Sequence, residues 1–170
     1  MSDIQIIDNF LPEKEFNNIL DVFITKGFPW YIADISDYNN DNNTQLFHIL
    51  YNNNVPFSDY FNKLQPIYNK LNIFSLYKVR MIATMKSEDK KNLYHTDLEF
   101  LNSKNNNVKT AVYYFNSNDG GTEFEHNEQI VESVSNRMII FPHHLKHRTV
   151  KHTKGDPFRY VLNLNYVELN

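Results

Sequence analysis

The hydrophobic pattern of the chain changes at Ile73, and this change limits the folds that the chain can adopt. From Ile73 onward, short apolar or alternating runs are separated by polar turns, which is typical of strands in antiparallel sheets. About eight such strands at close spacing predict a jelly-roll, or double-stranded β-helix, whose mouth would hold the site. The expected strands are residues 73–86, 93–100, 108–116, 121–126, 128–134, 136–142, 146–152 and 158–168.

The N-terminal third has a helical pattern instead. Pro12 suits the first turn of a helix whose apolar residues recur at helical spacing until Gly27 can stop it. A second helix is expected over residues 57–71, and Pro66 should kink it or split it in two. We therefore expect a mainly β protein with N-terminal helices, in which two or three α-helices brace the outside of a sheet.

The other N-terminal segments are short. Residues 4–10 and 28–35 favour strands, and residues 38–44 form a loop rich in Asn and Asp. The chain shows no repeat and no linker, so its 170 residues predict a single domain. Within this domain, residues 1–72 are the expected helical support region and residues 73–170 the jelly-roll core.

The composition excludes several kinds of site and partner. The chain has no cysteine, so a transition metal would need nitrogen and oxygen ligands. A formal charge of −3 supplies no general attraction to phosphate backbones, so nucleic acid is not an expected partner. The first residues are acidic where a signal peptide is basic, and no segment is long and apolar enough to span a membrane. We expect a soluble, cytoplasmic protein without a membrane partner.

His95 and Asp97 lie two residues apart in one of the expected strands. In an extended segment such residues point to the same face, so this imidazole and this carboxylate should converge. A histidine from a later strand would complete a set of two histidines and one carboxylate, which leaves positions open on Fe(II). His147, near the start of the strand expected over residues 146–152, is our candidate for this third ligand.

Other histidines compete for these roles. His126 and Glu128 form a competing His-x-Glu pair, but only nineteen residues separate Glu128 from His147. That distance leaves little chain for the strands that must separate the two halves of a site. The alternative distal ligands are His143, His144 and His152.

The last expected strand, residues 158–168, has two different faces. One face is apolar and the other is largely polar. Such a strand either lines a polar cavity or presents an exposed edge. The apolar face carries Tyr160, Leu162, Leu164 and Tyr166, and the other face carries Arg159, Val161, Asn163 and Asn165.

Five motifs follow one another between residues 75 and 168. They are Tyr94-His95-Thr96-Asp97, residues 110–116 (Thr-Ala-Val-Tyr-Tyr-Phe-Asn), residues 120–124 (Gly-Gly-Thr-Glu-Phe), residues 136–142 (Asn-Arg-Met-Ile-Ile-Phe-Pro), and His147 with Arg159-Tyr160. In this order they resemble the core of the 2-oxoglutarate- and Fe(II)-dependent dioxygenases. Within that superfamily they are most similar to the prolyl-4-hydroxylase-like branch.

The resemblance implies an enzyme and a role for each motif. His95, Asp97 and His147 would bind iron, Arg159 would pair with the distal carboxylate of 2-oxoglutarate, and Tyr114 would donate a hydrogen bond to it. The implied cofactor is Fe(II), with 2-oxoglutarate and O2 as cosubstrates and ascorbate as a further candidate. No catalytic residue is implied beyond the metal centre.

The implied reaction hydroxylates an unactivated C–H bond, on a prolyl or other amino-acid side chain, and oxidatively decarboxylates 2-oxoglutarate to succinate. Arg159 stands twelve residues after His147, slightly farther than the family spacing, and Gly155-Asp156-Pro157 fits an extra turn. The substrate could be a peptide, a protein or a small molecule. Loops 38–44, 86–92 and 101–107 would select it.

Two other functions stay open at this stage. The first is a jelly-roll protein that binds metal or serves a structural role without turnover. The second is a nucleic-acid demethylase of the alkylation-repair type, whose pattern has a second arginine six residues after the first. This chain has Asn165 at that place. The sequence identifies neither the substrate nor the oligomeric state.

Overall fold

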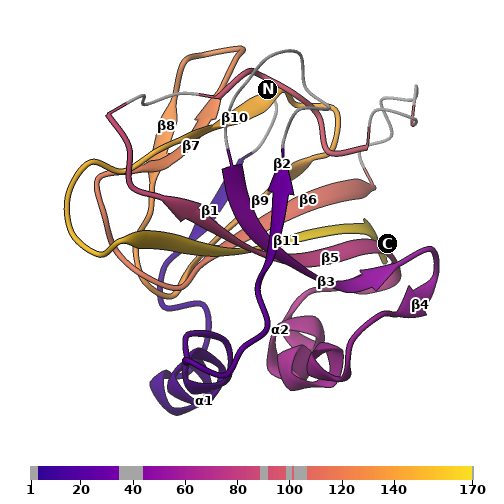
Figure 1. Ribbon diagram of the computed structural model, residues 1–170. Helices are drawn as coiled ribbons and strands as arrows, with labels where there is room; N and C mark the ends of the chain where they lie inside the picture. Colours follow the sequence, from indigo (N-terminus) through magenta and orange to yellow (C-terminus); the bar gives the residue numbers. More distant parts are fainter. Residues whose placement is uncertain (1–3, 35–43, 89–91, 99–100, 102–106, 170) are drawn as a thin grey trace.

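The computed structural model describes residues 4–34, 44–88, 92–98, 101 and 107–169, which form two antiparallel sheets and a helical layer (Figure 1). The large sheet has the order β1-β9-β6-β11-β5-β3-β2, with β4 paired to β3. Its strands are β1 (Gln5–Ile7), β2 (Tyr31–Asp34), β3 (Thr44–Asn52), β4 (Val55–Pro56), β5 (Ile73–Met85), β6 (Val108–Tyr114), β9 (Arg137–Pro142) and β11 (Phe158–Glu168). The small sheet has the order β10-β7-β8, formed by β7 (Gly121–Phe124), β8 (Ile130–Glu132) and β10 (His147–Val150).

The helices lie together against one face of the large sheet (Figure 1). Helix α1 (Glu13–Phe23) buries Phe16, Ile19 and Phe23, which recur at helical spacing, and two glutamates in its first turn suit the positive end of the helix. The second expected helix is split, as Pro66 predicted, into the 3-10 helix η2 (Asp59–Leu64) and helix α2 (Gln65–Lys70). Pro66 occupies the first turn of α2, where its missing N–H costs nothing.

Strand β11 separates the two cores of the molecule. It pairs with β5 on one side and with β6 on the other. Its residues Leu162, Leu164 and Tyr166 are buried in the core under the helices. Its opposite face points into the space in front of the small sheet, where Arg159 and Asn163 line a cavity. The polar face therefore belongs to a cavity and not to an exposed edge.

A second core fills the space between the two sheets. Phe124 and Val131 of the small sheet pack with Ile139 and Phe141 of β9 and with Val161 of β11. The mainly β, two-sheet arrangement agrees with the jelly-roll expected from the strand pattern. Strands β1 to β4 also join the large sheet, so the region expected to be a helical support supplies strands as well.

Two strand predictions differ from the structure. Strand β3 was not predicted, because its apolar residues face both ways and Asn-rich segments flank it. The strand expected over residues 93–100 is wrong for the described residues 92–98, which make one bridge at His95 and then turn. Most of the Asn- and Asp-rich loop over residues 38–44 lies outside the described part of the chain.

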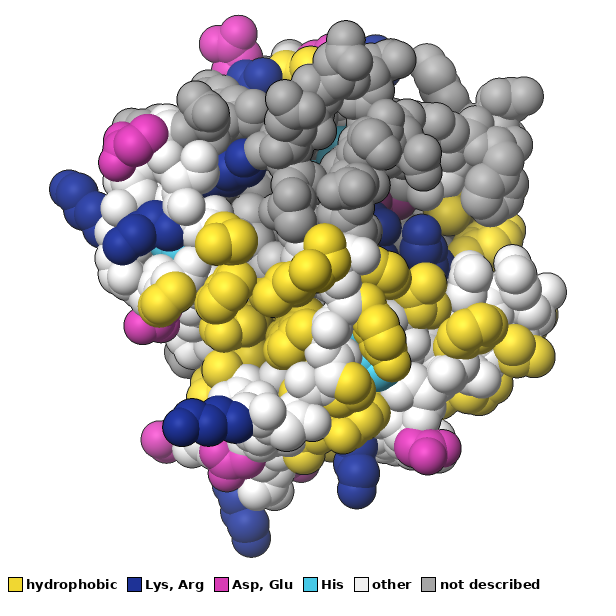
Figure 2. Space-filling model, viewed as in Figure 1, with side chains coloured by type: hydrophobic (Ala, Val, Ile, Leu, Met, Phe, Trp, Pro, Cys, Tyr) yellow, Lys and Arg dark blue, Asp and Glu magenta, His cyan; other side chains and the backbone are white. Residues whose placement is uncertain are grey.

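Hydrophobic side chains gather in the middle of the face shown in Figure 2. Tyr31 and Ile32 of the edge strand β2 are among the exposed apolar residues of the molecule, as is Phe57. A hollow of about 720 Å³ lies along β3, between β2 and β4. None of the described helices has the length and apolar character needed to cross a membrane.

Candidate metal centre

Segment 92–98 brings His95 and Asp97 to His147, as the sequence predicted, but by a different route. His95 and His147 are cross-strand neighbours whose backbones exchange two hydrogen bonds of 3.0 Å. Directly after this bridge the segment turns, so that Asp97 reaches the amides of β11 in the large sheet. A strand that continued beside β10 could not make this crossing. The convergence of His95 and Asp97 with His147 was therefore predicted correctly, but the extended conformation expected after His95 was not.

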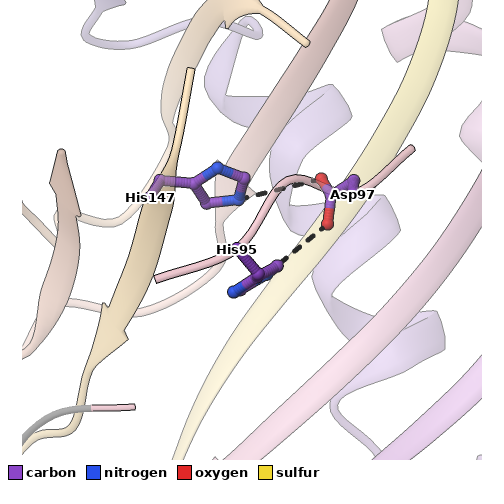
Figure 3. A group of neighbouring side chains, drawn as sticks. All are labelled: His95, Asp97 and His147. Carbon is purple, nitrogen blue, oxygen red and sulfur yellow. Dashed lines mark ion pairs between the residues drawn. The ribbon is translucent and has the colours of Figure 1, made fainter. Parts of the chain in front are cut away.

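The three side chains point toward one another (Figure 3). Nε2 of His95 lies 3.8 Å from Oδ1 of Asp97, and Nε2 of His147 lies 3.8 Å from Oδ2. One ligand atom from each residue falls within 4.8 Å of the others, which is close enough for a shared ion. Two imidazoles and one carboxylate form the donor set that suits Fe(II) and leaves positions open for other ligands.

Backbone carbonyls orient both imidazoles. Nδ1 of His95 lies 3.2 Å from the carbonyl oxygen of Leu93, and Nδ1 of His147 lies 3.1 Å from that of Leu145. Because a carbonyl only accepts, each Nδ1 must carry the hydrogen and donate it. In the neutral form of each ring, Nε2 then has the free lone pair on the side that faces Asp97, the arrangement expected of metal-ligating histidines.

Asp97 is an ionised carboxylate in a buried place. Its side chain is only 2% exposed, and Asn163 and Asn165 donate to Oδ2 at 2.9 and 3.1 Å. Burial by itself raises the pKa of Asp97, but the basic neighbours, His147 and then Arg80, and the amide of Asn163 outweigh it and hold the pKa well below its usual range. The sequence placed both asparagines on the polar face of β11, yet gave no sign that they hold Asp97.

Burial favours the neutral form of His147. It is buried, and burial lowers its pKa despite the nearby negative charge of Asp97. A neutral imidazole is the form that binds a metal.

A cluster of three side chains, which the sequence did not reveal, stabilises the position of segment 92–98. The Tyr94 hydroxyl donates to Oε1 of Glu123 at 3.0 Å, and the guanidinium of Arg148 donates to both carboxylate oxygens of Glu123 at 3.1 Å. The guanidinium of Arg148 lies over the Tyr94 ring, 4.0 Å from its centre. This cluster joins the segment that carries His95 to β7 and to β10, which carries His147.

A cavity of about 90 Å³ opens beside the three ligands and extends to Arg159. Arg159 is 2% exposed, and its one hydrogen bond is a long one, 3.3 Å from Nη1 to the carbonyl of Gly121. Its Nε is buried without a partner, and no acidic side chain in the described part of the chain forms an ion pair with it. Burial lowers the pKa of this guanidinium, which is the sign of an uncompensated cation.

Tyr114 lies next to Arg159, with its ring centre 5.7 Å from the guanidinium carbon. It is fully buried, and its hydroxyl lies 2.8 Å from Oγ1 of Thr122 and 3.4 Å from the carbonyl of Val131. In the contact between the Tyr114 and Thr122 hydroxyls, either group can donate. Thr122, rather than Tyr114, is among the described residues that line the cavity.

The competing histidines lie elsewhere. His126 and Glu128 are exposed near the end of β7, and His143 and His144 lie in the turn after β9. His152 donates from Nε2 to the carbonyl of Asp156 at 2.8 Å. In the described part of the chain, the group that could hold a metal comprises His95, Asp97 and His147.

Comparison with known proteins gives a fold but no close relative. No family model matches the sequence, and a search of curated proteins found no match. Among solved structures, a prolyl hydroxylase from Trichoplax adhaerens, in complex with a peptide of the hypoxia inducible factor oxygen degradation domain, matches with a TM-score of 0.67 and 13% identity, over 99% of this chain and 84% of that one.

Two further matches show the range of this fold. A prolyl-4-hydroxylase from Pseudomonas putida has a TM-score of 0.62 and 12% identity, over 100% of this chain and 95% of that one. The α-ketoglutarate-dependent epimerase SnoN of nogalamycin biosynthesis has a TM-score of 0.69 and 11% identity, over 98% and 79%. The chain therefore has the fold of the 2-oxoglutarate- and Fe(II)-dependent oxygenases, as its motifs predicted. Prolyl hydroxylases are among the proteins that share this fold.

Proposed function

We propose that this protein is an Fe(II)- and 2-oxoglutarate-dependent dioxygenase, built on a double-stranded β-helix, that hydroxylates an unactivated C–H bond of a prolyl or other amino-acid side chain. One observation carries the proposal. A His-Asp-His group and a buried guanidinium without an acidic partner share one cavity. The first suits a metal, and the second needs an anion. A dicarboxylate that binds both at once satisfies the two requirements.

His95, Asp97 and His147 would hold the iron through Nε2 and carboxylate oxygens. Fe(II) supplies the one-electron chemistry that the use of O2 requires. The protein contributes fixed donors: the carbonyls of Leu93 and Leu145 orient the rings, and the amides of β11 hold the carboxylate. The overall reaction balances as 2-oxoglutarate, O2 and R–H giving succinate, CO2 and R–OH.

Arg159 would bind the distal carboxylate of 2-oxoglutarate. A guanidinium forms two parallel hydrogen bonds with a carboxylate, and in a buried place this pairing also relieves the cost of the isolated cation. We assign Tyr114 to the same cosubstrate site as a hydrogen-bond donor to 2-oxoglutarate; its hydroxyl lies 2.8 Å from that of Thr122, which lines the cavity.

The substrate in this proposal is a peptide, a protein or a small molecule, and residues 1–170 act as one domain in the cytoplasm. The peptide complex of the Trichoplax adhaerens enzyme supports a peptide by analogy. A demethylase of nucleic acids is disfavoured, because Asn165 stands where a second arginine is expected and its amide is engaged with Asp97.

The test is succinate release from 2-oxoglutarate under air, with Fe(II) and with a panel of proline-containing peptides and free amino acids. We expect slow release without substrate and faster release with one class of substrate. Omission of iron and the Asp97→Ala substitution are the controls, and both should abolish release. Iron-independent release, or no release from folded protein under any condition, would contradict the proposal.

A further inference from the structure

Strand β5 presents a second basic group to the cavity. Arg80 lines the cavity on the same strand face as Lys78, two residues earlier. In the register of β5 with β11, Arg80 faces Asn163 and Lys78 faces Asn165. The partners on β11 are thus neutral amides, and they give no charge compensation to the two cations.

The charges around the cavity do not balance. Arg80, Arg148, Arg159 and Asp97 are the charged side chains among its described lining residues. Arg148 is paired with Glu123, and Arg159 is assigned to the distal carboxylate of 2-oxoglutarate. A dication at the metal centre would be matched by the dianion of the cosubstrate. Because that dianion includes the carboxylate assigned to Arg159, the described lining residues Arg80, Arg159 and Asp97 keep a net charge of +1, in addition to the half-buried Lys78.

Arg80 is poorly satisfied by Asp97. Its Nη2 lies 3.5 Å from Oδ1, whereas charge-assisted hydrogen bonds measure about 2.7–2.9 Å. Oδ2 of the same carboxylate already accepts from two asparagines, and Asp97 is also a proposed metal ligand. Nε of Arg80 is buried without a partner. The guanidinium of Arg80 therefore has unused hydrogen-bond donors next to the proposed metal centre.

Exposure distinguishes Arg80 from Arg159. The side chain of Arg80 is 24% exposed, while Arg159 is 2% exposed. In the register of β11 with β5, Arg159 lies opposite Thr84, which is four residues along β5 from Arg80. At about 3.3 Å per residue, the two arginines are roughly 13 Å apart along the strand direction. Arg159 is thus the more enclosed of the two guanidinium groups, and Arg80 is the one more accessible to an entering molecule.

We propose that Arg80 determines specificity by binding a carboxylate of the primary substrate next to the C–H bond that reacts. The substrate class is then an amino acid with a free carboxylate, or a peptide with an acidic residue beside the modified one. This inference rests on the proposed function and narrows it. Because Arg80 lies beside Asp97, a carboxylate held by Arg80 keeps the adjacent carbons close to the metal ligands.

The test compares the binding of carboxylic acids with the binding of the corresponding amides. The anaerobic protein loaded with Fe(II) and 2-oxoglutarate is titrated with free amino acids and their α-amides, and with capped peptides that carry Glu or Gln beside proline. Binding is followed by the change in the visible spectrum. We expect at least one acid to bind roughly tenfold to a hundredfold more tightly than the corresponding amide, the range for a hydrogen bond to a charged group. The responding arm shows whether the carboxylate belongs to a free amino acid or to a peptide.

Variants then assign the preference to a residue. In Arg80→Gln the acid-to-amide ratio should fall close to one, and Arg80→Lys should give an intermediate ratio because charge is kept without the bidentate fork. Lys63→Gln is the matched control, since Lys63 is an exposed cation of η2 in the helical layer, and its ratio should equal that of the parent.

Three results would overturn the inference: an unchanged ratio in Arg80→Gln, a parent ratio of one, or binding of no acid at all. Weaker binding of 2-oxoglutarate in Arg80→Gln with an unchanged acid-to-amide ratio would assign Arg80 to the cosubstrate instead. Absence of the spectrum of the iron and 2-oxoglutarate complex in the parent would defeat the proposed function itself, so the two failures are distinguishable.

Discussion

Replacement of Arg159 by methionine should stabilise the metal-free protein while destroying its cosubstrate site. Arg159 is 2% exposed, has one long hydrogen bond and has no ion-pair partner among the described residues, so its charge is a cost to folding. Replacing a buried ion pair by apolar side chains of similar volume is often neutral or stabilising by about 1–4 kcal/mol, and a buried cation without an ion-pair partner has less to offset its desolvation. Allowing for the lost contact with Gly121, we expect a gain of about 1–3 kcal/mol. In a chain of this size, that gain corresponds to roughly 2–12 °C in melting temperature.

With 2-oxoglutarate present, the parent should become more stable than Arg159→Met. At one hundred times its dissociation constant, 2-oxoglutarate stabilises the parent by about 2.7 kcal/mol. In Arg159→Met the distal carboxylate would be desolvated without a charge partner, at a cost of about 3–5 kcal/mol, or two to four decades in affinity. Its melting temperature should therefore not respond to 2-oxoglutarate at the same concentration.

Anaerobic calorimetric scans of the parent and the variant, without metal and then with Fe(II) and 2-oxoglutarate, measure both effects. Arg137→Met is the matched control: Arg137 makes a two-pronged ion pair with the exposed Asp8, at 2.6 and 3.0 Å. It should lose up to about 1 kcal/mol and keep the full response to 2-oxoglutarate. A lower melting temperature of metal-free Arg159→Met, or an undiminished response of this variant to 2-oxoglutarate, would refute the reasoning.

Four other substitutions test the distal ligand, the support of the ligand segment and one carboxylate outside the site. His147→Ala should abolish Fe(II) binding in equilibrium dialysis while His144→Ala retains it, and the opposite outcome would show that the wrong distal ligand was chosen. Tyr94→Phe removes the hydrogen bond to Glu123 and should weaken Fe(II) binding about threefold to tenfold in the same assay, with an unchanged affinity excluding a positioning role. Hydrogen bonds from the side chain and backbone of Thr153, and from the backbone N–H of Lys154, lower the pKa of Asp119. The ionised carboxylate therefore stabilises the fold above the pKa of Asp119 in the unfolded chain, about 3.9, and this stabilisation is lost as the pH falls below that value. Denaturant titrations should show the parent more stable than Asp119→Asn at neutral pH and the difference shrinking toward pH 3, whereas a constant difference would contradict this assignment.

The positions of most strands along the chain were accessible from sequence because they depend on local patterns. The convergence of His95, Asp97 and His147 was indicated by the spacing of the first two and by the resemblance of the motifs. Strand β11 alternates between an apolar and a polar face, and the structure keeps this alternation, with one face in the core and the other at the cavity. Pro66 divided its helix for a reason that acts within one turn of the chain.

The parts that were missed depend on contacts between distant segments. Residues 93–100 alternate like a strand, yet the buried carboxylate of Asp97 finds its donors on β11, and this requirement overrides the local preference. The ion pair of Glu123 with Arg148, and the position of Arg80 opposite Asn163, follow from strand registers. No periodicity within the sequence encodes those registers.

The central claim, that one cavity holds Fe(II) on His95, Asp97 and His147 and 2-oxoglutarate on Arg159, is tested most directly by the visible spectrum of the anaerobic protein. Titration of 2-oxoglutarate into the Fe(II) protein should produce a metal-to-ligand charge-transfer band that saturates and that needs both components. Asp97→Ala should give no band, and Asp97→Glu at most a trace. Folded parent protein that gives no band, or that binds 2-oxoglutarate equally well with and without iron in calorimetry, would contradict the account.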